Sequence, residues 1–285
     1  MNNGQALTIE AGTVVKGMAG QGADAAALIV ARGGQLFAEG TADCGITFTF
    51  EADNLDGATP YDTRGQWGGL IVLGDAPTNL PTGEGQIEGV PADNDRAKYG
   101  GSNAADNSGV ITYVSIRHGG TQLSAANEIN GLTLGGVGSG TIIEHVEVVS
   151  NDDDGIEFFG GSVNAKYLVV AYVGDDSFDF DEGYNGHLQF LLSIQDENSN
   201  RAIEWDGSTE SDDRKADTST LPDYSAPVIA NMTAIGIGKD GTSNHEDNNV
   251  GLEIRDNAGG QVWNSIVTDF AKSILDIEAA ESAMG

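Results

Sequence analysis

The sequence predicts an all-β fold, a right-handed parallel β-helix in which each coil of the solenoid takes about 22–25 residues. Three observations predict it. The apolar residues occur in short runs that are dominated by β-branched and aromatic side chains. Clusters of glycine, asparagine and aspartate separate these runs. Runs of the same kind recur at a fixed spacing along the middle of the chain.

The short apolar runs have the composition of β-strands, because β-branched and aromatic side chains pack well on a pleated, half-buried surface. The clearest runs lie at residues 28–30, 46–50, 70–73 and 110–114. Helical spacing of apolar residues is missing from most of the chain. Residues 270–284, which combine alanine, glutamate and isoleucine, are the exception and predict one short C-terminal helix.

The repeat is clearest in the middle of the chain. Val146, Leu168 and Phe190 each begin an apolar run, and the three runs start 22 residues apart. An acidic turn and a second short strand follow each run. A period of roughly 20 to 30 residues with two or three strands per unit is typical of a solenoid, whereas a propeller repeats at about 40 residues. This period favours the parallel β-helix over an antiparallel sandwich or jelly roll.

The whole chain, residues 1–285, is expected to form one β-helix domain. Three stretches interrupt the period, at residues 51–66, 75–109 and 207–226. They are rich in aspartate, asparagine, glycine, threonine and proline, and they contain few large apolar residues. Insertions into a solenoid usually form loops on one face, so we expect these stretches to leave the coils as loops.

The charge of the chain excludes several classes of partner. It carries 44 Asp and Glu against 13 Lys and Arg, which gives a formal net charge of -31. We expect no nucleic-acid partner, because binding to phosphates needs many lysines and arginines that displace counterions. We also expect no membrane insertion, since no apolar run is long enough to span a bilayer. The first ten residues lack the basic and apolar segments of a signal peptide, and Cys44 alone forms neither a disulfide nor a cysteine zinc site.

Acidic residues occupy equivalent positions in successive coils. In residues 156–158, 178–180 and 203–205 an acidic residue stands between two apolar ones, and neighbouring side chains on a strand point to opposite faces. We therefore expect the apolar residues to stack inside the coil and the acidic residues to form a column outside it, with carboxylates about 4.8 Å apart. A separate column, expected to be structural, contains His145, Tyr167 and Gln189.

Carboxylates at this spacing repel each other unless a cation lies between them. Clustered aspartate and glutamate oxygens are ligands that calcium prefers, so a calcium site, or a row of sites, is one interpretation of the column. The other is a solvated acidic face that binds nothing. Both depend on the strand register, since a slip of one residue would turn the acids inward. The candidate metal ligands are Glu157, Asp179, Asp181, Glu204, Asp206, Asp153, Asp154, Asp175 and Asp176, with Asp179, Asp181, Glu204 and Asp206 at the expected centre.

Two arginines fall close to the acidic column in the predicted register. Arg255 lies beside Asp206, and Arg201 precedes Glu204. A β-helix polysaccharide lyase commonly combines calcium with an arginine or lysine base, so both arginines are candidate catalytic residues. The alternative is that they pair with nearby acids and relieve the repulsion. We favour this alternative, because ion-pair networks gather such groups as well.

A family resemblance is carried by six segments: LTIEAGTVVKG, ARGGQLFAEGTADCGITFTF, RGQWGGLIVLG, GVITYVSIRHGG, EINGLTLGGVGSGTIIEHVEV and NDDDGIEFFGG. They resemble a widespread group of secreted or cell-surface β-helix proteins of marine and environmental bacteria, most of them hypothetical exported proteins or lipoproteins. The resemblance implies a pectate-lyase-like β-helix and an extracellular or cell-surface location. It implies no established activity.

Two functional hypotheses follow. The first is a non-enzymatic extracellular module, structural, adhesive or self-assembling, with an acidic face that binds cations. A solenoid has open strand edges at both ends, so a homo-oligomer or filament joined through the coil ends belongs to this hypothesis. The second is a calcium-dependent polysaccharide lyase, or another carbohydrate-active enzyme, that acts on acidic glycans; its partner would be a polysaccharide.

Overall fold

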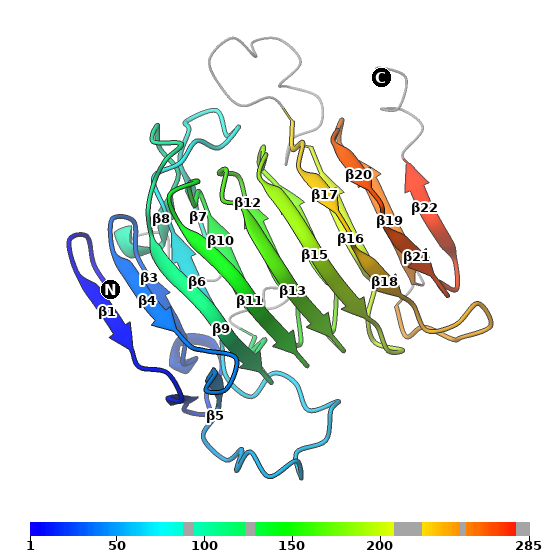
Figure 1. Cartoon of the computed structure of the whole chain (residues 1–285), viewed down its shortest axis with the longest axis horizontal. Helices are drawn as coiled ribbons and strands as arrows, with labels where there is room; N and C mark the ends of the chain where they lie inside the picture. Colours follow the sequence, from blue (N-terminus) through cyan, green and yellow to red (C-terminus); the bar gives the residue numbers. More distant parts are fainter. Residues whose placement is uncertain (88–93, 123–128, 208–223, 246–248, 278–285) are drawn as a thin grey trace.

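The chain forms a parallel β-helix with two long sheets, as the sequence predicts (Figure 1). The computed structural model describes residues 1–87, 94–122, 129–207, 224–245 and 249–277. One sheet has 12 strands and the other has eight. Every strand pairing within these two sheets is parallel. A small antiparallel pair, β7 (Gly85–Gln86) and β8 (Lys98–Tyr99), lies apart from them.

The strands of the larger sheet are β1 (Ala6–Ile9), β2 (Val14–Gly17), β4 (Gln35–Glu39), β5 (Ile46–Phe50), β9 (Gly109–Arg117), β11 (Ile142–Val149), β13 (Ala165–Ala171), β15 (His187–Ile194), β17 (Val228–Ala230), β18 (Thr233–Ile235), β20 (Gln261–Trp263) and β21 (Ile266–Thr268). The strands of the smaller sheet are β3 (Leu28–Val30), β6 (Leu70–Leu73), β10 (Leu132–Gly135), β12 (Ile156–Phe159), β14 (Phe178–Asp181), β16 (Arg201–Asp206), β19 (Val250–Arg255) and β22 (Ser273–Ile277). Two short 3₁₀ turns, η1 (Gly22–Asp24) and η2 (Asp95–Ala97), complete the described elements.

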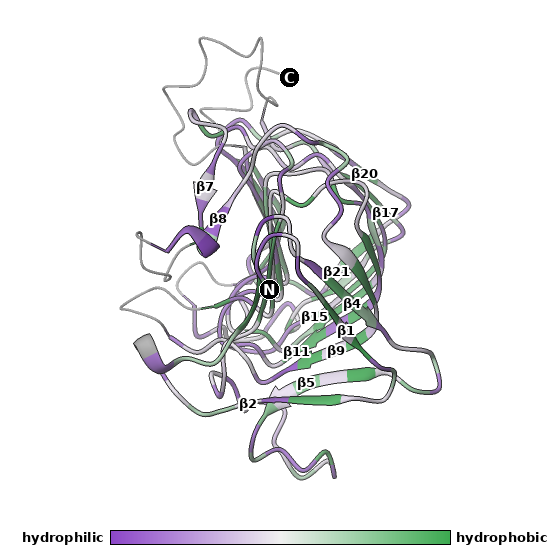
Figure 2. Ribbon diagram, turned by 90° about the vertical axis from the view of Figure 1, so that its left-hand side faces the viewer, coloured by the Kyte–Doolittle hydropathy of each residue, from purple (hydrophilic) through white to green (hydrophobic). Residues whose placement is uncertain are grey.

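Each strand pairs with its equivalent one coil later, so side chains of one kind stack in columns. In the smaller sheet Phe158 aligns with Phe180, and Phe180 aligns with Trp205. Their rings lie 5.4 and 5.7 Å apart between centroids and are fully buried. Burial of such large apolar side chains is the main favourable contribution to stability. Figure 2 shows that hydrophobic residues follow the strands of the larger sheet, while hydrophilic residues gather in the turns.

The predicted interruptions of the period have different structures. Residues 51–66 contain no strand. The stretch 75–109 carries β7, η2 and β8, and is anchored where the Tyr99 hydroxyl donates to the Glu182 carboxylate at 2.9 Å. Most of 207–226 lies outside the described residues.

The prediction of a short helix over residues 270–284 is wrong in the part that the structure describes. Residues 273–277 form β22, which pairs with β19 in parallel register. Pairing with the preceding coil outweighs the weak helical propensity of this segment. Residues 278–284 lie outside the described part. Within the described ranges, no helix is long and apolar enough to cross a membrane.

Candidate metal centre

The strand register brings four acidic side chains into one column on the smaller sheet. Glu157 aligns with Asp179, Asp179 with Glu204, and Glu204 with Glu253. The residues on either side of each acid point into the apolar core, so the acids point outward. The alternation of apolar and acidic residues therefore predicts the register correctly.

The column is shielded from solvent, which the sequence does not predict. Glu157 and Asp179 each expose only 8% of their surface. The side chains of Glu204 and Glu253 are 14% exposed. Such burial is expensive for ionised carboxylates unless a positive charge or hydrogen bonds compensate them. Each carboxylate of the column therefore needs a group that offsets its negative charge.

Two arginines compensate the C-terminal half of the column. The Arg201 guanidinium lies 3.4 Å from Asp176 and 3.3 Å from Glu204, and it also forms an ion pair with Glu253. Arg255 donates to both carboxylate oxygens of Asp206, at 2.5 and 2.9 Å, and lies 2.8 Å from Glu204. Both arginines are thus paired with nearby acids, which is the arrangement that the sequence favours over a catalytic role.

The same contacts control the protonation of the arginines. Burial by itself lowers the pKa of Arg201, but the carboxylates of Asp176 and Glu204 outweigh burial and hold this pKa above its ordinary value. At Arg255 burial also lowers the pKa, but the hydrogen bond with Asp206 and the charges of Glu204, Asp206 and Glu253 together outweigh it and raise the pKa. Both side chains therefore remain charged donors, which is the wrong state for a catalytic base.

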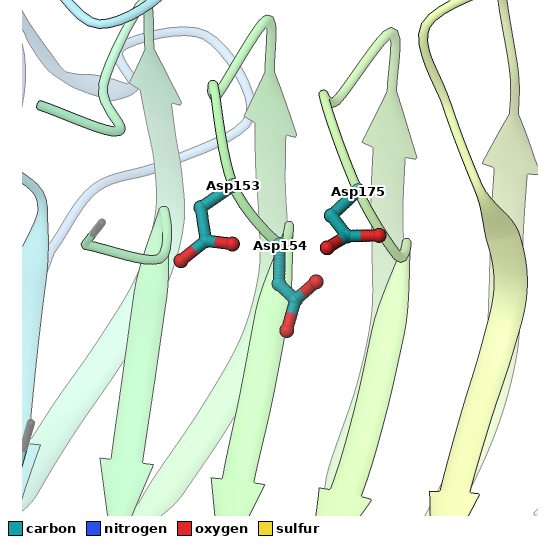
Figure 3. Close-up of side chains that lie close together, drawn as sticks. All are labelled: Asp153, Asp154 and Asp175. Carbon is teal, nitrogen blue, oxygen red and sulfur yellow. The ribbon is translucent and has the colours of Figure 1, made fainter. Parts of the chain in front are cut away.

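The N-terminal half of the column contains the candidate metal centre, where Asp179 forms no ion pair with a lysine or arginine among the described residues. One carboxylate oxygen from each of Asp154, Glu157 and Asp179 lies within 4.8 Å of the other two, and all three residues are buried. Glu157 comes from β12 and Asp179 from β14, while Asp154 belongs to the turn that precedes β12. A second group, made of Asp153, Asp154 and Asp175, shares Asp154 and lies in the turns of two successive coils (Figure 3).

Negative charge accumulates around Asp154 and Asp179. Burial raises the pKa of Asp154 well above its ordinary value, and the charges of Asp153 and Asp179 raise it further. Burial likewise raises the pKa of Asp179, followed by the effect of Glu157. In the described part of the chain neither aspartate forms an ion pair with a lysine or arginine.

The polar contacts of the centre leave one buried oxygen unsatisfied. Asp154 accepts a hydrogen bond from the backbone N–H of Asp176 at 2.9 Å, and Glu157 accepts one from the Asn130 amide. The Oδ1 atom of Asp179 is buried without a hydrogen-bond partner. Buried polar atoms are rarely left so in folded proteins, and this atom lies in the cluster of three carboxylates.

The donor set fits a hard divalent cation. It offers only carboxylate oxygens, without histidine or cysteine, which suits calcium rather than zinc or copper. Asp154, Glu157 and Asp179 would hold the ion, and its positive charge would replace the missing basic partner.

The candidate metal centre lies one coil closer to the N-terminus than the centre of the site predicted from the sequence. Of the four residues at the expected centre, only Asp179 belongs to it. Glu204 and Asp206 are paired with arginines, and Asp181 accepts a hydrogen bond from the backbone N–H of Glu182 at 2.5 Å. The remaining turn ligand, Asp176, is bound to Arg201 as described above. The sequence pattern alone cannot distinguish these positions, because it repeats in every coil.

Sequence reasoning missed the contribution of Asn130. This residue comes one coil before Asp154, directly ahead of Gly131, as Asp154 comes directly ahead of Gly155. The parallel between the segments Asn-Gly-Leu-Thr and Asp-Gly-Ile-Glu was the signal that would have identified it. Thr133 takes the place before Glu157 in the column, and Asn130, in the turn ahead of it, donates the hydrogen bond from its amide to Glu157.

Comparison with known protein families agrees with the observed architecture. Residues 1–285 match the family model described as a pectate-lyase like beta helix domain. No curated protein and no solved structure matches the chain.

Proposed function

Since the chain belongs to the family of pectate-lyase-like β-helix domains, we propose that it is a non-enzymatic extracellular or cell-surface module that binds calcium at its acidic column. In this role the β-helix serves as a structural or adhesive body, and the ion holds neighbouring coils together. Calcium is the fitting cation because the centre contains only carboxylate donors.

A single observation carries the proposal: three buried carboxylates meet, and two of them, Asp154 and Asp179, form no ion pair with a lysine or arginine in the described part of the chain. Asp154, Glu157 and Asp179 lie on two neighbouring coils, and the buried Oδ1 atom of Asp179 lacks a hydrogen-bond partner. The adjacent coils show how the same column is neutralised when a cationic side chain is present. In the proposed site a divalent ion supplies that charge beside Asp154 and Asp179, with which no described arginine or lysine pairs.

The arrangement of the arginines supports a non-enzymatic role over the lyase hypothesis. A lyase of that kind needs an arginine or lysine that accepts a proton from the sugar beside the metal. Arg201 is only 7% exposed and contacts three carboxylates, and Arg255 is held by Asp206 and Glu204. Arg201 is thus shielded from a substrate, and Arg255, although its side chain is 32% exposed, is held by two carboxylates.

Calorimetric titration tests the proposed calcium site. Protein freed of metal with a chelator is titrated with calcium chloride, and we expect saturable binding. Binding energy is added to stability, so calcium at a hundred times its Kd should raise the unfolding free energy by about 2.7 kcal/mol. Asp179→Asn should weaken binding at least about tenfold, because it removes one charged ligand.

Asp240→Asn is the matched control, because it makes the same chemical change at a side chain that is 90% exposed. It should leave calcium binding unchanged. The proposal fails if the wild-type protein shows neither saturable heat nor thermal stabilisation with calcium, or if both aspartate variants bind alike.

Assembly through the coil ends is the second part of the proposed role. The last coil exposes large apolar side chains: Trp263 is 59% exposed, Ile266 61% and Leu275 51%. They lie on β20, β21 and β22, which end their sheets on this side. Open strand edges beside apolar side chains favour pairing with another chain, and a second copy offers parallel edges at β1 and β3.

A further inference from the structure

A column of stacked rings lies on the larger sheet. Tyr113, His145, Tyr167 and Phe190 follow one another in four successive coils, with ring centroids 4.2, 4.4 and 4.9 Å apart. The planes of neighbouring rings differ by at most 10°. The sequence analysis placed Gln189 in this column, and this is wrong: Gln189 aligns with Lys166, so Phe190 takes the place beside Tyr167.

The four ring residues share an unusual backbone conformation. Their φ angles lie between 50° and 61°, in the left-handed region that side chains other than glycine rarely adopt. The strand bends at each of them, and the ring turns outward at the bend. Tyr167 and Phe190 are each 39% exposed as a result, which is high for aromatic residues in the middle of a sheet.

The rings form one wall of a groove that crosses several coils. The groove has a volume of about 700 Å³ and runs from Thr41 to Thr233. Beside the rings runs a second column of lining residues, in which the polar Thr47, Ser115 and Glu147 are followed by the apolar Val169 and Leu192. A groove with an aromatic wall and a few placed polar groups is a typical small-molecule or glycan site.

The charges around the groove cancel, although the whole protein is strongly acidic. Arg117 lies 2.9 Å from Glu147, and the Ser115 hydroxyl donates to the same carboxylate at 2.6 Å. On the other side of the ring column, Lys166 lies 3.2 Å from Glu144. The formal charge of these four groups sums to zero within a chain of net charge -31. An uncharged ligand therefore fits this groove.

The ring column leaves polar groups and ring edges open to a ligand. In the described part of the chain, the hydroxyls of Tyr113 and Tyr167 and the imidazole of His145 have no hydrogen-bond partner. The faces of the rings are covered by their neighbours, so their edges carry the contact. Ring edges bear partial positive charge, which favours the oxygen atoms of a ligand.

A peptide is a poor occupant, because the strands that carry the groove have no free edges. β9, β11, β13 and β15 are each paired on both sides, so a peptide cannot join the sheet as an extra strand. We propose that the groove binds a linear, uncharged oligosaccharide, whose hydroxyls meet the tyrosine hydroxyls and the histidine along the ring column. This site lies on the larger sheet and is independent of the calcium site on the smaller one.

Binding of defined hexasaccharides tests the inference. Cellohexaose, laminarihexaose and mannohexaose are the neutral probes, hexagalacturonate is the anionic one, and ligand-observed NMR and calorimetry measure the binding. We expect saturable binding of at least one neutral probe and none of the anionic probe. Chelation of calcium should not change the affinity at temperatures where the protein stays folded.

Two variants locate the site. Tyr167→Ala removes one ring from the column, and we expect about tenfold weaker binding. The double change Tyr113→Phe with Tyr167→Phe keeps the stack and removes only the hydroxyls, so a loss of roughly threefold to tenfold is expected even if the alanine variant folds poorly. Tyr61→Ala, at an exposed tyrosine outside the groove, should bind like the wild type.

Three outcomes would overturn the inference. They are the absence of saturable binding to every neutral probe, a preference for hexagalacturonate, and binding that persists unchanged in both the alanine variant and the double phenylalanine variant.

Discussion

Glu157 and Asp179 lie side by side on adjacent strands, paired in register, and each is more than nine-tenths buried. One coil further on, Glu204 occupies the same column but contacts Arg201 and Arg255. Among the described residues, Glu204 is thus paired with two arginines, whereas Asp179 forms no ion pair with a lysine or arginine. This difference supports the proposed calcium site and leads to the first two predictions.

The stability of the metal-free protein should fall as the pH rises from about 4 toward neutrality. Folding raises the pKa values of Asp154 and Asp179, mainly through burial. The folded state therefore holds these protons more tightly than the unfolded state, whose aspartates titrate near the ordinary value of about 3.9. The stabilisation that these two protonated aspartates contribute is present at low pH, and it is lost as the pH rises through their raised pKa values.

Thermal unfolding in a chelator, followed between pH 4 and pH 8, measures this effect. Added calcium should reverse the loss and should stabilise more at pH 8 than at pH 4, because the ion replaces the protons. The Asp179→Asn variant should show a weaker dependence on both pH and calcium. A calcium effect that is equal at both ends of this range would contradict the prediction.

Replacing Arg201 should strongly destabilise the fold. Arg201→Gln removes the buried ion pair of Asp176 and leaves Glu204 and Glu253 with Arg255 alone. Breaking a buried ion pair in this way costs about 3–5 kcal/mol. Urea unfolding measures the change. Lys239→Gln, at an exposed lysine, is the control and should cost less than about 0.5 kcal/mol. A loss below about 1 kcal/mol for the Arg201 variant would show that solvent already screens the cluster.

The protein should not cleave acidic polysaccharides. With pectate or alginate and calcium, we expect no ultraviolet absorbance from unsaturated uronate ends, because Arg201 and Arg255 are held as charged partners of carboxylates. The appearance of such products, and their loss in an Arg255→Ala variant, would favour the lyase hypothesis instead.

Association through the coil ends should depend on Trp263. We expect the average mass in light scattering to grow with protein concentration, and the Trp263→Glu variant to reduce this growth, since it places a charge on the exposed apolar end. Ile142→Glu, at an exposed apolar residue on β11 in the middle of the larger sheet, serves as the matched change and should leave the growth in mass unchanged. Wild-type protein that stays monomeric at high concentration would refute assembly through the ends.

Much of the acidic column was predictable from sequence because one periodicity controls it. Alternation of apolar and acidic residues in 156–158 and 178–180 sets which side faces the core, and the repeat sets which residues align. The groove was not predictable in the same way. A left-handed residue such as Tyr167 bends its strand and shifts the column by one position, and no local pattern in the sequence marks that conformation.

The sequence by itself determined the parallel β-helix and the stacking of acids outside a core of aromatic residues, because both follow from local alternation repeated once per coil. The tertiary structure alone decided which acids remain without a counter-charge. Arg201 reaches Asp176 in the preceding coil and Glu253 in the following one, whereas no arginine or lysine pairs with Asp154 or Asp179 in the described chain. That difference depends on the reach of long side chains across coils and on burial, which are properties of the folded molecule and not of any repeat in the sequence.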